Sequence, residues 1–306
     1  MRAALRAITS LEPDVKKTYK MARQLELLTA RLRGLPSDYL MWDRTVRCGD
    51  HEVPVRLFVP DRGRSPLLLF FHGGGWVTGG IENYTGVCAD LATATGCTVA
   101  SVDYRLAPEH KFPAAPEDCY AVARAFFLGH VPGVAPEEIV LMGDSAGGNL
   151  AAAVSLMARD RGEFSPRRQI LAYPSTWNDH TENSPFASIR ENGTDYLLTS
   201  KRIESFIELY RSSDADLQNP YFAPLLATDF SRQPDTLLIT AAYCPLRDEG
   251  EAYGEKLREA GAEVTIARLP NALHAFLMLP PRFEHVQQAY ALIREFMNIP
   301  VPSNAP

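Results

Sequence analysis

A serine between two glycines is the strongest chemical signal in this chain of 306 residues. Ser145 is the centre of the segment GDSAG at 143–147. The apolar run at 139–142 before this segment predicts a strand, and the run from Gly148 onward predicts a helix. A G-x-S-x-G segment between a strand and a helix is typical of a sharp, strained turn that exposes the serine oxygen as a nucleophile. We therefore predict that Ser145 is a catalytic nucleophile.

A glycine triplet is the second signal, in the segment HGGGW at 72–76, directly after the apolar run at 67–71. Consecutive glycines increase the entropy that is lost on folding, so they are expected where bare backbone must approach another group. The N–H groups of Gly73, Gly74 or Gly75, together with that of Ala146, can point at one oxygen. We predict that they form an oxyanion hole, in which one donor is worth about 3 kcal/mol.

His274 has the position in the sequence that a general base would need. It follows the last predicted strand, precedes the last predicted helix and lies downstream of Ser145. A histidine beside a serine can remove the hydroxyl proton during attack on a carbonyl carbon. The sequence therefore predicts a serine hydrolase that forms and then hydrolyses an acyl-enzyme on Ser145.

Taken together, these segments resemble the bacterial hormone-sensitive-lipase family of α/β-hydrolase carboxylesterases. The resemblance covers about residues 45–298 and rests on HGGGW at 72–76, DYRLAPE at 103–109, GDSAGGN at 143–149 and PLRDE at 245–249. It implies the α/β-hydrolase fold and cofactor-free hydrolysis of short- to medium-chain carboxylic esters beneath a helical cap. It also implies that residues 103–109 and Asp144 support the site without reacting. Since many members of the family are dimers, a homodimer is a further expectation.

The sequence departs from this family at the acid of the triad. The family's acid stands immediately before Pro-Leu, where this chain has Cys244. In serine proteases, a neutral isostere in place of the acid lowers turnover about 10⁴-fold. A thiol is a weak hydrogen-bond acceptor and is mostly protonated at neutral pH.

Four interpretations of Cys244 remain open from the sequence. Cys244 occupies the acid position in a slow or specialised esterase, or Asp248 substitutes for the acid from one helical turn further on. Alternatively, the protein no longer hydrolyses esters, and its pocket serves ligand binding, cyclisation, elimination or acyl transfer. The fourth interpretation is an engineered substitution. A thiolate nucleophile at Cys244 is disfavoured, because that residue would lie on the far side of His274 from Ser145.

The remaining pattern predicts the α/β fold that would hold these residues. Short β-type runs at 53–59, 67–71, 98–102, 139–142, 169–173, 236–240 and 263–267 alternate with helical stretches near 84–95, 116–129, 147–160, 251–260 and 284–297. Such alternation predicts a mostly parallel sheet, of about eight strands, with helices on both faces. We assign residues 43–306 to this domain.

Two further segments are expected to form a cap over the site. Residues 1–42 are predicted to be helical, because Met21, Leu25, Leu28 and Leu32 recur at helical spacing and form one apolar stripe. This stripe is expected to cover the main domain, or alternatively a second copy of the chain. Residues 178–222, helical from 199 to 210, interrupt the alternation and are expected to complete the cap.

Aromatic side chains near these segments are candidates for the substrate pocket. They are Trp76, Tyr173, Tyr196, Phe206 and Phe276.

The composition of the chain argues against several classes of partner and site. The net charge of −6 gives no support to a nucleic-acid partner, and the five cysteines lack the spacing of a zinc site or a disulfide framework. We expect four of these cysteines to be small core residues. We identify no signal peptide and no apolar run long enough for a membrane span, so we expect a soluble cytoplasmic enzyme. We also expect no bound metal, and a small ester as the partner molecule.

Overall fold

The computed structural model describes residues 14–32, 39–60, 65–130 and 135–299. In this part of the chain a single sheet of eight strands has the order β1-β2-β4-β3-β5-β6-β7-β8. The strands are β1 (Tyr39–Cys48), β2 (His51–Pro60), β3 (Leu67–Phe71), β4 (Thr98–Val102), β5 (Ile139–Asp144), β6 (Arg168–Ala172), β7 (Asp235–Tyr243) and β8 (Val264–Leu273). The helices are α2 (Val15–Leu32), α3 (Ile81–Thr95), α4 (Ala114–Phe127), α5 (Ala146–Arg161), α6 (Ala187–Asn192), α7 (Ser200–Tyr210), α8 (Arg247–Glu259) and α9 (Glu284–Phe296).

The predicted α/β-hydrolase sheet is confirmed, and it is parallel except at one edge. β1 pairs with β2 and β2 pairs with β4 in antiparallel fashion, whereas every pair from β4 to β8 is parallel. The sequence did not predict β1, so the expected helical segment 1–42 is wrong at residues 39–42, which are strand.

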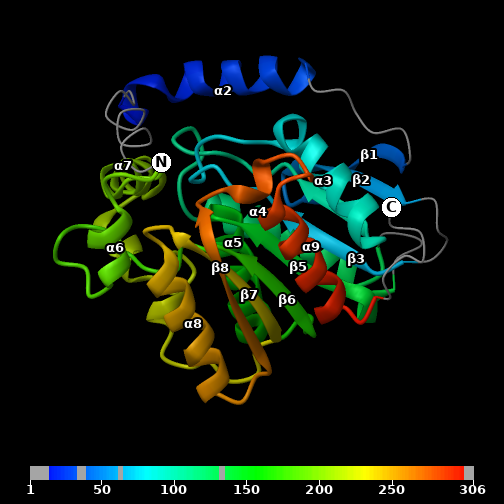
Figure 1. Cartoon of the computed structure of the whole chain (residues 1–306). Helices are drawn as coiled ribbons and strands as arrows, with labels where there is room; N and C mark the ends of the chain where they lie inside the picture. Colours follow the sequence, from blue (N-terminus) through cyan, green and yellow to red (C-terminus); the bar gives the residue numbers. More distant parts are fainter. Residues whose placement is uncertain (1–13, 33–38, 61–64, 131–134, 300–306) are drawn as a thin grey trace.

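Helices cover both faces of the sheet, as expected for strands that are apolar along their whole length. All five residues of β3 and all six of β5 are buried. α3 and α9 contact each other on one face, and α4, α5 and α8 cover the other (Figure 1). Cys48, Cys88, Cys97 and Cys119 are buried free thiols, as predicted.

Of the segment 1–42 that was predicted to form a cap, residues 1–13 and 33–38 lie outside the described residues, and α2 docks with the opposite face to the one expected. α2 crosses the top of the molecule and packs against α3 and α7 (Figure 1). Met21, Leu25 and Leu28 are each at least 60% exposed, so the apolar stripe faces outward. The face that docks carries both the buried Val15 and Arg23, whose guanidinium donates hydrogen bonds to the carbonyls of Val77 and Ala107.

A buried contact between a histidine and a glutamate joins the insertion at 178–222 to α8. His180 Nε2 lies 2.7 Å from Glu249 Oε2, and both side chains are fully buried. Glu249 Oε1 also accepts hydrogen bonds from the N–H groups of Thr176 and Trp177 at 2.7 and 3.1 Å. The insertion is therefore attached beside the segment that carries Cys244.

None of the helices in the described ranges is long and apolar enough to cross a membrane.

Candidate active site

The parallel strands bring three site residues to one edge of the sheet. Ser145 directly follows β5, Cys244 follows β7 and His274 follows β8. Because the carboxyl ends of parallel strands meet at the same edge, residues 129 positions apart in the chain come into contact there.

Ser145 lies on a strained turn, as predicted. Its backbone has φ 56° and ψ −119°, a conformation that a non-glycine residue rarely adopts. A side chain at Gly147 would collide with the carbonyl oxygen of Phe71, so only glycine lets α5 begin this close to the sheet. Ser145 N–H donates to the carbonyl of Ala172 at 2.9 Å, which holds the turn in place.

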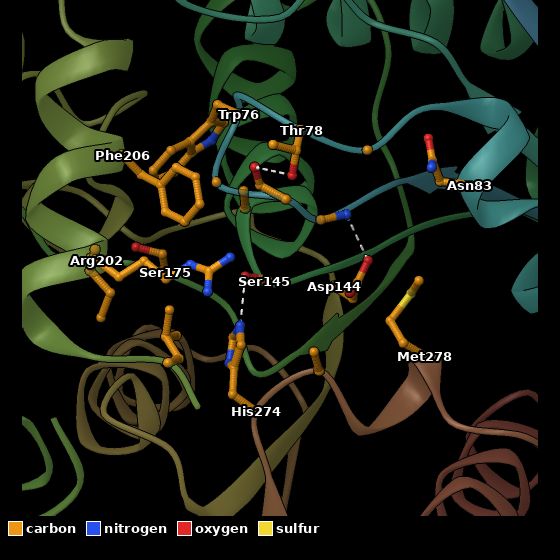
Figure 2. Close-up of a pocket in the computed structure, with 18 of the residues that line it drawn as sticks. Trp76, Thr78, Asn83, Asp144, Ser145, Ser175, Arg202, Phe206, His274 and Met278 are labelled. Carbon is orange, nitrogen blue, oxygen red and sulfur yellow. Dashed lines mark hydrogen bonds between the residues drawn. The ribbon is translucent and has the colours of Figure 1, made fainter. Parts of the chain in front are cut away.

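His274 and Ser145 are within hydrogen-bond distance. His274 Nε2 lies 2.9 Å from Ser145 Oγ (Figure 2). The ring edge of Tyr173 packs against the imidazole, with ring centroids 4.9 Å apart. Burial, and to a smaller extent the nearby Arg202 cation, lower the pKa of His274 to about 3. The imidazole is therefore neutral at physiological pH and can accept the hydroxyl proton.

Cys244 lies beside the ring nitrogen of His274 that does not face Ser145. Its Sγ lies 3.1 Å from His274 Nδ1, on the side of the ring opposite to Ser145, and the residue is fully buried. Burial raises the pKa of the Cys244 thiol far above its usual range. Burial also favours the neutral form of the His274 imidazole. A thiolate–imidazolium pair is therefore disfavoured, because both of its charged partners are disfavoured.

Asp248 has other partners. Its carboxylate accepts hydrogen bonds from Ser188 N–H and from Arg247 Nε, both at 2.7 Å. No hydrogen bond joins Asp248 to His274, although the structure describes both residues. The interpretation of Asp248 as a substitute acid therefore has no geometric support.

Gly73 is a structural donor, which corrects its assignment to the oxyanion hole. Its N–H donates to Asp144 Oδ1 at 2.8 Å (Figure 2) and also lies 3.1 Å from the Tyr84 hydroxyl. Burial raises the pKa of Asp144 to about 7, although its hydrogen bonds act in the opposite direction. Asp144 thus supports the glycine loop, as the resemblance implied. Gly73 lines the cavity together with Gly74, Gly75 and Ala146, but its N–H is already engaged by Asp144.

Comparisons with known proteins agree with this geometry. The profile of the alpha/beta hydrolase fold family matches residues 68–278. An arylesterase of Saccharolobus solfataricus is 38% identical over 240 residues, which are 78% of this chain and 77% of that protein. The carboxylesterase NlhH of Mycobacterium tuberculosis is 34% identical over 301 residues, 92% of each protein. The solved structure of a hyperthermophilic esterase from Pyrobaculum calidifontis matches with a TM-score of 0.86 at 36% identity, covering 97% of this chain and 96% of that one.

The chain belongs to the hormone-sensitive-lipase-like family of α/β-hydrolase esterases. It is a carboxylic ester hydrolase, so the prediction of its activity class is confirmed.

The esterase has a cavity of about 500 Å³ in front of Ser145. Of the five predicted aromatic residues, Trp76 and Phe206 line it. Tyr173, Tyr196 and Phe276 do not line it, because they are core residues: Tyr173 and Phe276 pack edge to face, and Tyr196 stacks on a neighbouring tyrosine.

Sequence reasoning missed two charged residues in the wall of the esterase's cavity. They are Glu26 of α2 and Arg202 of α7. A charge within an amphipathic helix resembles any solvated position, so no local pattern marks these residues as part of the site. Among the described residues, no group of three or more His, Cys, Asp or Glu side chains is placed to hold a metal ion.

Proposed function

We propose that this esterase cleaves short- to medium-chain carboxylic esters through an acyl-enzyme on Ser145, with His274 as general base and Cys244 at the acid position. The observation that carries the proposal is the 2.9 Å contact between Ser145 Oγ and His274 Nε2, at a strained turn that faces the cavity. A nucleophile and a base within hydrogen-bond reach are the minimal apparatus for acyl transfer.

The reaction proceeds in two halves. Ser145 Oγ attacks the ester carbonyl carbon while His274 Nε2 takes the hydroxyl proton, and the developing oxyanion accepts hydrogen bonds from backbone N–H groups of Gly74, Gly75 and Ala146. The bond to the alcohol then breaks, and the imidazolium returns its proton to the leaving oxygen. In the second half a water molecule gives its proton to His274 and attacks the acyl-enzyme, which releases the carboxylic acid and restores Ser145.

Cys244 makes the base weaker than a carboxylate at the same place would. A neutral thiol orients the ring of His274 but supplies no negative charge to the imidazolium that forms in each transition state. We infer that turnover is lower than that of the same chain with an aspartate at position 244.

The cavity supports small substrates. Its volume of about 500 Å³ lies within the range of ~300–1,000 Å³ that is usual for small-molecule sites. Trp76 and Phe206 give part of its wall an aromatic surface that suits an acyl chain or an aryl alcohol.

The test is cleavage of 4-nitrophenyl acetate and butyrate, followed at the nitrophenolate absorbance. We expect Ser145→Ala to abolish both the cleavage and the covalent labelling by a fluorophosphonate. Ser165→Ala is the matched control, because Ser165 is exposed and lies in the connection before β6, at the edge of the sheet opposite to the site. Cleavage that persists in Ser145→Ala refutes the proposed nucleophile. Saturable ligand binding without label or cleavage in the natural chain would favour a non-hydrolytic function instead.

A further inference from the structure

Trp76, the last residue of the HGGGW segment, has a backbone conformation that needs support from its surroundings. Its φ is 59°, and the two residues before it, Gly74 and Gly75, also have positive φ. Glycine adopts this region freely, whereas a residue as large as tryptophan rarely does so. Such a conformation persists only where the surrounding structure fixes it. The contacts of the Trp76 side chain therefore help to set the path of the glycine loop.

One set of contacts joins Trp76 to the helix that follows the nucleophile. The indole Nε1–H donates to Asn149 Oδ1 at 3.3 Å. Asn149 lies in the first turn of α5, and its backbone N–H donates to the carbonyl of Ser145 at 3.0 Å. The Asn149 side chain is fixed in turn, because Nδ2 donates to the carbonyls of Ser175 and Phe222, both at 2.9 Å. The indole is therefore held at a defined position relative to Ser145.

A second set of contacts comes from α7 of the cap. The ring of Tyr210 stacks on the indole of Trp76, with ring centroids 4.5 Å apart and planes inclined by 3°. Phe206 lies one helical turn earlier, on the same face of α7. Its ring lies beside Trp76 (Figure 2) and covers Gly75 so closely that a methyl group added there would overlap it. Two residues of one helix face therefore contact two consecutive residues of the glycine loop.

Tyr210 is itself fixed in place and lies outside the cavity. It is fully buried, and its carbonyl accepts a hydrogen bond from the N–H of Phe112 at 2.9 Å. The rings of Phe112 and Phe222 pack against it, with centroids 5.8 and 5.1 Å away. Its hydroxyl has no hydrogen-bond partner among the described residues, so its contact with the loop is made by the ring. Since Tyr210 does not line the cavity, any role in the reaction is indirect.

We propose that Tyr210 is a positioning residue for the oxyanion hole, which it orients by holding Trp76 against Asn149. This inference rests on the proposed function, because the N–H groups of Gly74 and Gly75 act as donors only in a reaction that passes through an oxyanion. Their direction depends on the path of the loop. An oxyanion donor must lie about 2.7–3.1 Å from the developing charge, and a displacement of about 1 Å costs up to about 100-fold in rate. The cap helix α7 thus contributes to kcat as well as to the cavity wall.

Three substitutions at position 210 test the proposal in the hydrolysis of 4-nitrophenyl butyrate. Tyr210→Leu removes the stacked ring, so kcat should fall about 10- to 100-fold while KM changes less than about 3-fold. Tyr210→Met fills more of the space and should give a smaller loss in kcat. Tyr210→Phe keeps the ring and removes only the unpartnered hydroxyl, so it should keep the natural kcat. Each kcat is calculated per active serine, counted by complete fluorophosphonate labelling, which corrects for any unfolded fraction.

A transition-state analogue separates positioning of the oxyanion hole from a general loss of structure. Ser145 Oγ bonds to the carbonyl carbon of trifluoromethyl pentyl ketone, its proton passes to His274, and the carbonyl oxygen becomes an oxyanion in the hole. Methyl pentyl ketone binds without forming a stable adduct. Tyr210→Leu should weaken inhibition by the trifluoromethyl ketone about as much as it lowers kcat/KM, and should change inhibition by the methyl ketone less than about 3-fold.

Phe127→Leu is the matched control. Phe127 stacks on Phe164 with ring centroids 4.9 Å apart, and Phe164 lies in the connection before β6, at the edge of the sheet opposite to the site. This variant also loses one ring of a stacked pair, so it should lose stability but keep its kcat per active serine.

Two results would overturn the role of Tyr210 and leave the proposed function standing. In one, Tyr210→Leu and Tyr210→Met keep the natural kcat or show their loss in KM. In the other, Tyr210→Phe loses as much activity as Tyr210→Leu. If the natural chain neither cleaves the ester nor takes up the label, the proposed function itself fails.

Discussion

Replacing Cys244 by aspartate is the sharpest test of the triad. The substitution puts a carboxylate where Sγ now lies 3.1 Å from His274 Nδ1, so an oxygen can accept the N–H that a thiol accepts poorly. The backbone there is already fixed, because Asn192 Nδ2 donates to the Cys244 carbonyl at 3.2 Å. The change therefore alters the charge beside the base without requiring a new backbone path.

The size of the gain follows from the pKa of the base. Burial and Arg202 lower the pKa of His274 from 6.5 to about 3. One pKa unit corresponds to about 1.4 kcal/mol, so this shift opposes the imidazolium by roughly 5 kcal/mol. Part of the ring faces the cavity, where solvent reduces the electrostatic cost, and we take about 2–4 kcal/mol as the share that a carboxylate recovers. Cys244→Asp should thus raise kcat by roughly 30- to 1,000-fold. This gain is smaller than the roughly 10⁴-fold loss of turnover that follows replacement of the triad acid in a serine protease.

The pH profile of activity provides an independent test of the same reasoning. The low pKa of His274 predicts that kcat/KM of the natural chain stays level as the pH falls from 8 to about 5, because the base remains unprotonated. A carboxylate at position 244 stabilises the imidazolium and raises the pKa of His274. Activity of Cys244→Asp should then decline as the pH falls through this higher value, so the acid limb appears at higher pH.

The assay is initial-rate hydrolysis of 4-nitrophenyl butyrate between pH 4 and 9, corrected for the ionisation of nitrophenol. Cys244→Ser is the matched control, since it changes the size and polarity of the side chain without adding charge, and it should not raise kcat. If the folded Cys244→Asp variant has an unchanged kcat and an unchanged acid limb of its pH profile, the reasoning is refuted. Another group would then already stabilise the protonated form of His274.

Two further substitutions separate structural roles from catalytic ones. Asp248→Asn should change kcat less than about 3-fold. It should lower the free energy of unfolding, measured by denaturant titration, by about 1–2 kcal/mol, because it weakens the charged hydrogen bonds that Asp248 accepts. A loss near 10⁴-fold in kcat would instead identify Asp248 as the acid of the triad. Gly75→Ala should lower kcat at least about 100-fold in the ester assay, because Gly75 has φ 61° and an added methyl group would overlap the ring of Phe206. Gly49→Ala is its control, since Gly49 has φ 65° but open space around it, so the strain of a positive φ occurs there without damage to the site.

The sequence predicted the parts of this fold that depend on continuous patterns. The apolar run at 67–71 coincides with the whole of β3, because a strand buried on both faces favours an apolar residue at every position. The β-type run at 98–102 coincides with the whole of β4. Ser145 was predictable for a different reason, since its turn is possible only with glycine on both sides.

Features that depend on which side of an element faces the protein were not predictable. The spacing of Met21, Leu25 and Leu28 identifies an amphipathic helix, but spacing alone does not reveal that the carbonyls of Val77 and Ala107 accept hydrogen bonds from Arg23 on the opposite face. β1 begins with consecutive apolar residues that show no alternation, and Leu40, Met41 and Trp42 are exposed, because this edge strand is held mainly by its backbone pairing with β2.

The same limitation applies to the site itself. Tyr173 and Phe276 have the right chain positions for a pocket, yet their rings pack edge to face beneath it. Gly73 belongs to the glycine triplet, but its N–H points at Asp144, and the direction of an N–H is set by tertiary contacts. The outward stripe of α2 remains consistent with the prediction that a second copy covers it, which a measurement of mass in solution would test.

Cys244 and Arg202 act on the base in the same direction. A carboxylate at position 244 would place one negative charge beside His274, and the thiol removes it. Arg202 adds one positive charge on the cavity side, so two separate features of this chain disfavour the imidazolium. Cys244→Asp would offset one of them, because the carboxylate stabilises the imidazolium that forms in each transition state, and this is the physical reason to expect the faster turnover of that variant.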